Sequence, residues 1–600
     1  MQRFLLAHVD KIPCDPGFAY CGNAPSRADL LGAMDVPKRS LLQAGMFLLV
    51  CFPACGPGRG VREQVPGLVT EHAMVVSAHP LATEVGVAVL RDGGNAVDAA
   101  VAVHYALAVV LPWAGNIGGG GFMVMRSSDG TVRTLDFRET APLAASRDMY
   151  VNDAGAVDTA MSQHGHRAAG VPGAVAGLHA AHDSLGTLPM QRLIQPAIDL
   201  AAQGFSLTAL EASWLNGALP ALRSYSTQNS TYDERAHWSV GDTIQLPELA
   251  ATLARIRDNG PDEFYALTTA DLIVAEMQRG AGLITKSDLV AYRPVWRAPV
   301  HSRYRGLDIH GVGPPSSGGV LLAQLLAAME PMDVQGAGWQ QVATVHRMVE
   351  AERRAYADRA SYMGDPDRVC VPVAALVDSA YVHRRMSDFD PRRATPSAMV
   401  EAGVPVEHEE TTHFSIVDAM GNAVSCTTTL NGRYGSHVVV GGAGFLLNNE
   451  MDDFSLAPGA PNAYGLVGGE ANAIAPGKRM LSSMTPTIVT RDGALFMVLG
   501  TPGGSTIPTS VFQVLLNVVD HDMNMQSAVS APRFHHQWLP DAIQQEAGAI
   551  AHSDSAVLAR MGHRLVVRES IGQVDAICVL PDGRLEGGAD PRGDDAAGGY

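Results

Sequence analysis

Thr411 and Thr412 begin a strand-like run, and a threonine in this position could act as a nucleophile. A threonine hydroxyl is a poor nucleophile unless a base lies beside it, and a free N-terminal amine is one of the few bases that needs no second side chain. An α-amino group has a pKa of about 8, so at neutral pH it can exchange a proton with the hydroxyl of the same residue. Chemistry at Thr411 therefore requires that the peptide bond after Glu410 is cut.

A β-hairpin is predicted to hold these threonines. Residues 412–418 are predicted to form one strand, and residues 423–430, which are rich in valine and threonine, a second strand. Residues 419–422, Ala-Met-Gly-Asn, have the composition of a turn. A plain threonine-rich hairpin without chemistry is the alternative.

The position of the turn sets the residues opposite the nucleophile. A hairpin centred on Met420 and Gly421 places Thr411 opposite Leu430. Thr429 and Asn431 would then lie on either side of Thr411. Both side chains could hydrogen-bond the Thr411 hydroxyl or its substrate.

A series of short motifs is distributed along the chain. They are 116–122 (NIGGGGF), 137–142 (FRETAP), 411–415 (TTHFS), 446–454 (LLNNEMDDF), 481–484 (LSSM), 500–505 (GTPGGS), 531–536 (APRFHH) and the final Gly-Tyr. In order and spacing they resemble the γ-glutamyltranspeptidase family. The resemblance covers about residues 65–600 and leaves the N-terminal extension outside.

The resemblance implies an α/β fold with α and β layers, the four-layer αββα sandwich of the N-terminal-nucleophile hydrolases, made as a precursor that cuts itself. The Thr411 hydroxyl would attack the carbonyl of Glu410, convert the amide to an ester, and water would release the two parts. A large subunit (56–410) and a small catalytic subunit (411–600) would remain together as a heterodimer. The free Thr411 would then form a γ-glutamyl-enzyme, with Thr429 orienting its hydroxyl.

Attack on an amide carbonyl builds negative charge on its oxygen, and two consecutive backbone N–H groups can receive that charge. Gly503 and Gly504 fit this need because glycine permits unusual dihedral angles and close approach. Each such donor typically contributes about 3 kcal/mol to lowering the barrier. An ordinary Pro-Gly-Gly turn is the alternative.

Substrate recognition needs one group for the α-carboxylate and another for the α-amine of a glutamyl unit. Arg138 can grip a carboxylate bidentately, and Ser482 and Ser483 can add donors. By itself, Arg138 next to Glu139 is typical of a surface ion pair.

The resemblance also implies the residues that bind the ammonium end. Asn431, Glu450 and Asp453 are similar to the family's set for this group, with Glu450 where some relatives have glutamine. Residues 458–469 resemble a mobile lid, with Tyr464 shielding the pocket, and their glycine and proline content suits a loop that opens. A plain surface loop is the alternative.

Elsewhere the patterns indicate layered α and β elements. Residues 73–77 are strand-like, and Asn95 is a candidate N-cap for an Ala/Val-rich helix with Asp98 in its first turn. The second half of the chain is expected to be mostly strands and turns. Long helical patterns cover 174–182, 190–203 and 340–363.

Composition and motifs exclude several function classes. The formal net charge of −18 argues against a nucleic-acid partner, because phosphate binding needs a basic surface. No phosphate-loop pattern occurs. His408 and His413 are five residues apart, not the four that would place them on one helix face for zinc, and His535-His536 is expected to be a structural pair. No metal and no cofactor are predicted.

Seven cysteines are too few and too widely spaced for a disulfide framework. Four of them fall within residues 1–55. The other three, Cys370, Cys426 and Cys578, are expected to be small buried residues.

Residues 34–55 predict a secretory signal. A basic start, Lys38-Arg39, precedes an apolar stretch that is too short and too interrupted for a membrane span. Residues 1–55 are therefore expected to be an extension and signal peptide with the true start at Met34, and the protein is expected to be periplasmic or secreted. A lipid anchor at Cys55 is a weaker alternative, and a buried apolar helix in place of a signal is another.

The resemblance implies an enzyme that removes the γ-glutamyl group from glutathione and passes it to water, an amino acid or a peptide. A glutaryl-cephalosporin acylase-like amidase of the same superfamily is the nearest alternative. Its substrate has no α-ammonium, so Asp453 and Glu450 would have no partner there. An uncut, non-catalytic relative that serves as a binding protein is the third reading.

Overall fold

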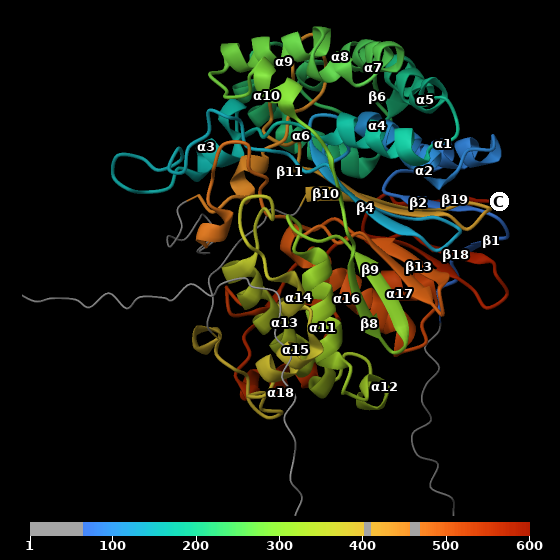
Figure 1. Ribbon diagram of the computed structural model, residues 1–600, viewed down its shortest axis with the longest axis vertical. Coiled ribbons are helices and arrows are strands. Elements are labelled where there is room, and N and C mark those ends of the chain that lie inside the picture. Colours follow the sequence, from blue (N-terminus) through green and yellow to red (C-terminus); the bar gives the residue numbers. More distant parts are fainter. Residues whose placement is uncertain (1–63, 401–409, 457–468) are drawn as a thin grey trace, which may run out of the picture. The chain divides into compact units, whose positions relative to one another are not determined.

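Two seven-stranded antiparallel sheets lie at the centre of this computed structural model, which describes residues 64–400, 410–456 and 469–600 (Figure 1). One sheet has the order β1 (Leu68–Thr70), β18 (Leu585–Gly588), β17 (Asp575–Val579), β13 (Ala494–Gly500), β12 (Thr487–Arg491), β9 (Leu307–Gly311), β8 (Val300–Tyr304). The other has the order β19 (Ala596–Gly599), β2 (Met74–Ser77), β10 (Glu410–Val417), β11 (Ala423–Asn431), β3 (Gly120–Arg126), β4 (Val132–Asp136), β7 (Val295–Arg297).

The two sheets pack face to face, with β10 and β11 against β13 and with β10 also against β17. Apolar side chains of both sheets, among them Val76, Val124, Ile488, Val498 and Ile577, fill the space between them. Larger apolar cores lie on the outer faces, where helices cover each sheet. Burial of three apolar interfaces therefore stabilises a helix–sheet–sheet–helix arrangement.

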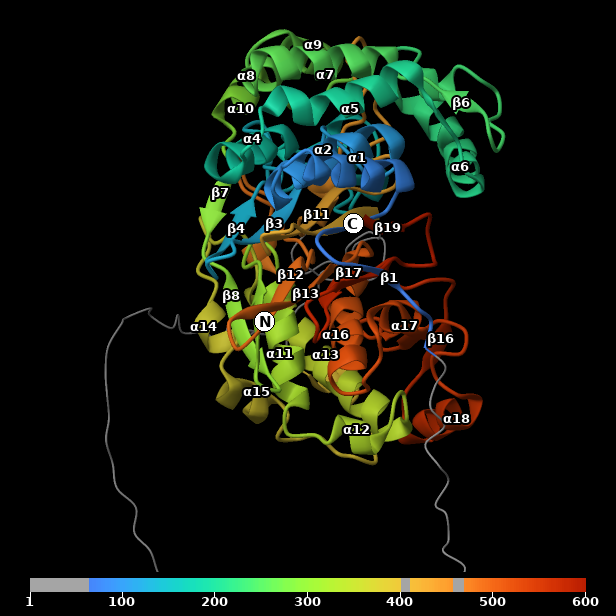
Figure 2. The same ribbon diagram turned by 90° about the vertical axis from the view of Figure 1, so that its right-hand side faces the viewer.

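The helical layers come from separate stretches of sequence, as Figures 1 and 2 show. Over β2, β3, β10 and β11 lie α1 (Pro80–Arg91), α2 (Ala96–Val110), α4 (Ala174–Leu185), α5 (Met190–Gln203), α6 (Ala209–Tyr225), α7 (Pro247–Asn259), α8 (Asp262–Tyr265), α9 (Thr268–Arg279) and α10 (Lys286–Ala291). On the opposite side lie α11 (Gly318–Met329), α12 (Val334–Ala337), α13 (Val342–Tyr362), α14 (Val373–Leu376), α15 (Ser379–Arg385), α16 (Ile507–Val519), α17 (Met525–Ser530) and α18 (His552–Met561).

Shorter elements complete the described chain. Small sheets pair β14 (Phe534–His535) with β15 (Ile543–Gln545) and β16 (Leu565–Val567), and β5 (Phe205–Ser206) with β6 (Thr243–Ile244). The short helix α3 (Thr159–Gln163) contacts the 3-10 helix η4 (Glu450–Asp453). In the described ranges, no helix has the length and apolarity needed to cross a bilayer.

The N-terminal helix signals are confirmed. Asn95 caps α2, its side chain accepting hydrogen bonds from the amides of Val97 and Asp98, while the Asp98 carboxylate accepts one from the Asn95 amide. This reciprocal arrangement satisfies N–H groups that the first helical turn leaves without partners.

The expectation of a second half built mostly from strands and turns is wrong. That half contains α11, α13, α16, α17 and α18. Helix α11 is apolar and buried over most of its length, so it shows little of the one-sided periodicity that identifies a surface helix. A short apolar run of this kind cannot be told from a buried strand by periodicity alone.

The predicted register of the β10–β11 hairpin is also wrong by one residue. Thr411 pairs with Thr429, not with Leu430, and a bulge between Glu410 and Thr411 then brings Glu410 opposite Asn431. The turn explains the shift, because the Asp418 carboxylate accepts hydrogen bonds from the amides of Met420 and Asn422 and so centres the turn on Met420.

Some predictions concern residues that lie outside the described part of the chain. These are the signal at 34–55, Cys55, His408 and Tyr464. Of the three described cysteines, Cys426 and Cys578 are buried as expected, but Cys370 is exposed. It lies in the irregular segment between α13 and α14, and such connections run over the protein surface.

Candidate active site

Thr411 lies in the strand β10, in the middle of the sheet and almost fully buried. The chain continues from Glu410 through Thr411 within this strand, so the Thr411 nitrogen is part of a peptide bond. The Thr411 Oγ1 atom lies 3.5 Å from Thr429 Oγ1 on β11 and donates a long hydrogen bond to it. Direct pairing of the two residues thus brings their hydroxyls together on one face of the sheet.

The hydroxyl of Thr429 is held from the other side by Asn431. The Asn431 amide N–H donates to Thr429 Oγ1 at 2.7 Å, and Asn431 has a φ of 72°. The Asn431 side-chain amide donates to the Asn449 carbonyl at 3.0 Å. Asn431 therefore connects the hairpin to the start of η4, which carries Glu450 and Asp453.

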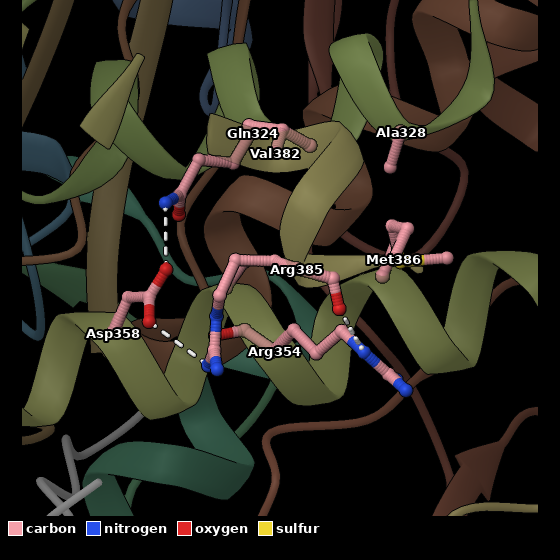
Figure 3. Close-up of a pocket in the computed structure, with 9 residues that line it drawn as sticks. Gln324, Ala328, Arg354, Asp358, Val382, Arg385 and Met386 are labelled. Carbon is pink, nitrogen blue, oxygen red and sulfur yellow. Dashed lines mark hydrogen bonds and ion pairs between the residues drawn. The ribbon is translucent and has the colours of Figure 1, made fainter. Parts of the chain in front are cut away.

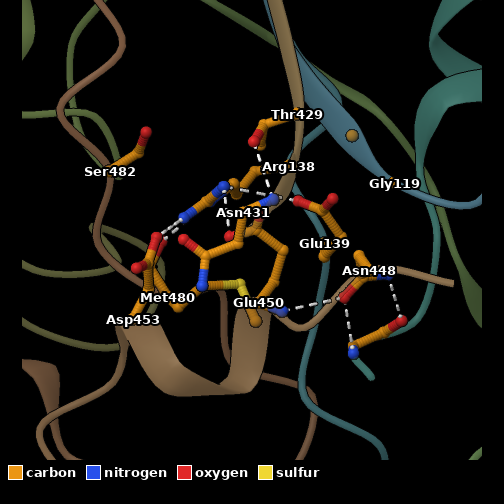
Figure 4. A network of polar contacts seen from close by, with 12 residues as sticks. Gly119, Arg138, Glu139, Thr429, Asn431, Asn448, Glu450, Asp453, Met480 and Ser482 are labelled. Atoms are coloured by element: carbon orange, nitrogen blue, oxygen red, sulfur yellow. Dashed lines mark hydrogen bonds and ion pairs between the residues drawn. The ribbon is translucent and has the colours of Figure 1, made fainter. Parts of the chain in front are cut away.

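Arg138 is buried in a cluster of carboxylates (Figure 4). Its Nη1 atom lies 2.7 Å from Glu450 Oε2 and 3.6 Å from Glu139 Oε2, and its Nη2 atom donates to Asp453 Oδ2. The same guanidinium donates to the carbonyls of Met480 and Leu481. The reading of Arg138 and Glu139 as a surface pair is wrong, because both side chains are inside the protein.

The structure brings several predicted substrate-binding residues together. Figure 4 shows Arg138, Asn431, Glu450, Asp453 and Ser482 around one site, with Thr429 beside them. The residue predicted to hold the carboxylate end thus contacts Glu450 and Asp453, which were predicted to hold the ammonium end. An α-amino acid carries a carboxylate and an ammonium group. Its carboxylate could replace Glu450 and Asp453 beside Arg138, while its ammonium group pairs with these two carboxylates.

The two serines differ in their surroundings. Ser482 Oγ accepts a hydrogen bond from the Met484 amide at 3.2 Å, and the Ser482 carbonyl accepts from Ser317. Ser483 is buried, and in the described part of the chain its Oγ atom has no hydrogen-bond partner. A buried hydroxyl without a partner is costly, so Ser483 Oγ is available to a ligand.

Gly503 and Gly504 form the turn from β13 into the 3-10 helix η6 (Gly504–Thr506), directly before α16. Their φ values are 130° and 52°, which favour glycine. In the described ranges, neither amide N–H donates a hydrogen bond, whereas the Gly503 carbonyl accepts from Thr506. The turn therefore has two consecutive backbone donors without an acceptor in this part of the chain, and their role as an oxyanion hole stays a prediction.

His413 lies on the nucleophile strand and packs against the end of β13; the sequence patterns considered it only as a zinc ligand and rejected that role. Its ring lies against Gly500 at the end of β13, where no side chain would fit. It contacts the hydroxyls of Thr427 at 2.8 Å and Ser415 at 3.1 Å. Burial lowers the pKa of His413 to about 3, so the ring is uncharged at neutral pH and positions strands β10 and β13.

Glu139 is a second residue that the motifs did not identify as part of the site. Burial raises the pKa of Glu139 to about 8, although the charge of Arg138 opposes this shift. Neither carboxyl oxygen has a hydrogen-bond partner among the described residues. No pattern in the sequence could show this burial, since adjacent Arg and Glu residues are most often exposed.

Two other features are not candidate substrate sites. A cavity of about 10 Å³ between α11, α13 and α15, lined by Asp358 and Arg385, has room for one water molecule (Figure 3). His535 and His536 are buried and bonded to Gln537 and Asp541, as expected of a structural pair.

Comparisons with known proteins agree with this geometry. The family model described as Gamma-glutamyltranspeptidase matches residues 82–600. The chain is 45% identical over 576 residues to the glutathione hydrolase proenzyme of Escherichia coli, covering 94% of this chain and 98% of that protein. It is 49% identical over 516 residues to the proenzyme of the same name from Pseudomonas aeruginosa, covering 85% and 91%.

Solved structures share the fold. The cephalosporin acylase of Bacillus halodurans superposes with a TM-score of 0.78 at 26% identity and covers 92% of this chain and 99% of that one. The Helicobacter pylori γ-glutamyltranspeptidase gives a TM-score of 0.53 at 41% identity, covering 57% and 96%. The predicted layered α/β fold of the N-terminal-nucleophile hydrolases is confirmed, and the chain belongs to the γ-glutamyltranspeptidase family.

Proposed function

We propose that the chain cuts itself between Glu410 and Thr411 and then acts as a glutathione hydrolase and γ-glutamyltransferase. The observation that carries the proposal is the pairing of the Thr411 and Thr429 hydroxyls beside the buried cluster around Arg138. A nucleophile and a site for a zwitterionic amino-acid group are thereby combined in one place.

In the first step, Thr411 Oγ1 bonds to the carbonyl carbon of Glu410 as the amide C–N bond breaks. The nitrogen takes up a proton and becomes the free amine of Thr411, and water then hydrolyses the ester. The products are a large chain that ends at Glu410 and a small chain that begins at Thr411. The two chains share the core between the sheets, since β2 and β3 flank the β10–β11 hairpin, so they stay associated.

In the second step, Thr411 Oγ1 attacks the γ-carbonyl of the substrate and its own amine carries the proton to the departing amine. The amides of Gly503 and Gly504 receive the negative charge on the carbonyl oxygen. Water, an amino acid or a peptide then takes the γ-glutamyl group from the enzyme and restores the hydroxyl.

Substrate binding exchanges charged partners within the Arg138 cluster. The substrate carboxylate pairs with Arg138, with hydroxyl donors from Ser482 and Ser483. The substrate ammonium pairs with Glu450, Asp453 and the side-chain oxygen of Asn431. Because each charge keeps an opposite charge beside it, no group is left buried and unpaired.

The first experiment compares the denatured masses of the wild type, Thr411→Ala and Thr412→Ala. Thr412 is the matched control, a buried neighbour whose side chain points to the other sheet face. We expect two fragments that join at Glu410-Thr411 in the wild type and in Thr412→Ala, and one intact chain in Thr411→Ala. A folded wild type that stays uncut would overturn the proposal and favour the non-catalytic relative.

An acylase-like amidase is the second candidate, because the superposed Bacillus halodurans structure is a cephalosporin acylase. A glutaryl group has no ammonium, so its binding would leave Glu450 and Asp453 without that partner. We expect turnover of a γ-glutamyl anilide to exceed turnover of the matching glutaryl anilide. The reverse order would favour the acylase reading.

The proposed place of action is the periplasm or the exterior, which rests on the sequence of residues 34–55 alone. Fractionation of producing cells tests it: the mature chain should lack these residues and leave the cytoplasm. Retention of the whole chain in the cytoplasm contradicts it.

A further inference from the structure

Three buried side chains that are not among the candidate active-site residues converge beside α13. His346 and Glu350 lie one turn apart on α13, and His563 follows the end of α18. Their nearest nitrogen and oxygen atoms all lie within 4.8 Å of one another. The exposed fractions of the three residues are 1%, 0% and 6%, so solvent hardly reaches them.

We propose that His346, Glu350 and His563 form a binding site for a divalent transition-metal ion of the Zn²⁺ class. Two imidazole nitrogens and one carboxylate oxygen are a ligand set that zinc accepts in proteins, with a water molecule as the fourth ligand. The spacing of four residues on a helix places the first two ligands on one face.

The hydrogen bonds of His346 leave the correct nitrogen for a metal. His346 Nε2 lies 2.8 Å from the Asp390 carbonyl oxygen, which can only accept, so this nitrogen carries the proton. His346 Nδ1 therefore has the lone pair and faces His563 Nε2 at 2.8 Å. Metal-bound histidines in proteins are commonly fixed in this way, through a carbonyl on the opposite nitrogen.

A metal ion would replace the hydrogen bond between the two rings. The His563 proton would move from Nε2 to Nδ1, so the ring stays neutral and no net proton is released. Two nitrogens bound to one tetrahedral Zn²⁺ lie about 3.4 Å apart, so the rings must separate by about 0.6 Å.

Glu350 is held in place but retains acceptor capacity. Its Oε1 atom accepts from the Thr395 amide at 3.0 Å, and its Oε2 atom accepts from Arg354 Nη1 at 2.7 Å. Each carboxylate oxygen has two lone pairs, so each can accept one further partner.

The neighbouring charges can accommodate a dication. Arg353 and Arg354 both lie next to Glu350, but Arg353 also pairs with Asp541, and Arg354 with Asp388 at 2.7 Å. Three carboxylates thus face two guanidinium groups before any metal enters. Each guanidinium group beside Glu350 therefore has a second carboxylate to balance its charge when a cation binds.

The site would also join the two products of the proposed cleavage. His346 and Glu350 lie before Glu410, whereas His563 lies after Thr411. One metal ion would therefore cross-link the large and small chains. The cross-linking role rests on the proposed self-cleavage, whereas the metal site itself does not.

Metal binding is tested on tag-free protein freed of metal with a chelator and titrated with ZnCl₂ in a calorimeter. The wild type and the uncut Thr411→Ala variant should both bind about one equivalent. Co²⁺ in place of Zn²⁺ should give the visible absorption of a four-coordinate ion. Absence of stoichiometric binding in folded wild type overturns the site. Because Thr411→Ala is expected to stay uncut, Zn²⁺ binding by this variant would support the metal site whether or not the wild type cuts itself.

The ligands are tested with His563→Gln, which retains an amide donor for His346 but is a poor zinc ligand. His552→Gln is the matched control, because His552 is exposed at the start of α18. We expect His563→Gln to lose the stoichiometric Zn²⁺ and His552→Gln to keep it. Should His563→Gln fail to fold, Glu350→Gln supplies the same comparison, and unchanged binding in either folded variant contradicts the assignment.

The cross-link has its own measurement. Zn²⁺ should raise the urea concentration at which the cut wild type separates into its two chains, and should have no such effect on cut His563→Gln. An equal effect on both proteins would overturn the bridging role.

Discussion

The hydroxyl oxygens of Thr411 and Thr429 lie 3.5 Å apart on directly paired residues of β10 and β11. The Asn431 amide N–H holds Thr429 Oγ1 at 2.7 Å, so the position of the Thr429 hydroxyl is determined by the backbone of its own strand. This relationship gives the Thr411 hydroxyl a hydrogen-bond partner in the uncut chain.

Thr429→Ala should slow both self-cleavage and turnover because the Thr411 hydroxyl loses its partner. Positioned proton-transfer groups commonly contribute about 10²- to 10⁴-fold, and we expect a loss toward the lower end. Thr429→Ser should restore most of the rate, since it keeps the hydroxyl. The appearance of the two fragments over time, followed by intact mass, measures the effect, and a wild-type rate in Thr429→Ala would contradict the role.

Glu139 should make substrate binding depend on pH. With its pKa raised to about 8 by burial, the carboxyl is mostly protonated at pH 7 and ionises as the pH rises through 8. The new negative charge, 3.6 Å from Arg138, competes with the substrate carboxylate for the guanidinium.

We therefore expect KM for a γ-glutamyl anilide to rise between about pH 7 and pH 9 in the wild type. Glu139→Gln keeps the site in its uncharged form and should show a smaller rise. The substrate amine also titrates in this range and affects both proteins equally. The measurement is therefore the difference in the rise of KM between the wild type and Glu139→Gln. Identical pH profiles would exclude Glu139 as the cause.

Gly503→Ala should lower kcat by about 10²- to 10³-fold, the usual loss for a displaced oxyanion donor. An added Cβ would lie 2.5 Å from Thr506 Oγ1 and 3.2 Å from the Gly572 Cα atom, so the turn must shift. Gly493→Ala is the control: this glycine also has a positive φ, but its added Cβ would have no heavy atom within 4 Å. Equal losses of kcat in both variants would point to backbone strain alone.

Asp575 and Asp595 should reduce stability as the pH rises. Burial, and then repulsion from Asp595, raise the pKa of Asp575 well above its usual value, and burial and Asp590 do the same for Asp595. Above about pH 4 the folded protein therefore holds more protons than the unfolded chain. The free energy of unfolding falls as the pH increases toward the raised values.

Asp575→Asn should flatten this dependence and raise Tm at pH 8 more than at pH 5. Asp582→Asn, at an exposed position in the turn between β17 and β18, is the matched control and should follow the wild type. Thermal unfolding at several pH values checks this prediction. A variant with the wild-type pH dependence would show that another group is responsible.

The sequence by itself determined the features that depend on a few neighbouring residues. The strands on either side of residues 419–422, the capping box at Asn95 and the helix over 190–203 follow from periodicity and turn chemistry, which act within about one or two turns of chain. The order of the motifs also identified the family before any contact was known.

Only the tertiary structure decided what depends on distant partners. Arg138 and Asp453 are 315 residues apart in sequence, and His346 and His563 are 217 apart. Whether an arginine is an exposed charge or the centre of a buried cluster depends on which strands and loops fold over it. The free energy of placing a charged side chain inside the protein depends on its burial and on its charged partners, and no local sequence pattern contains either.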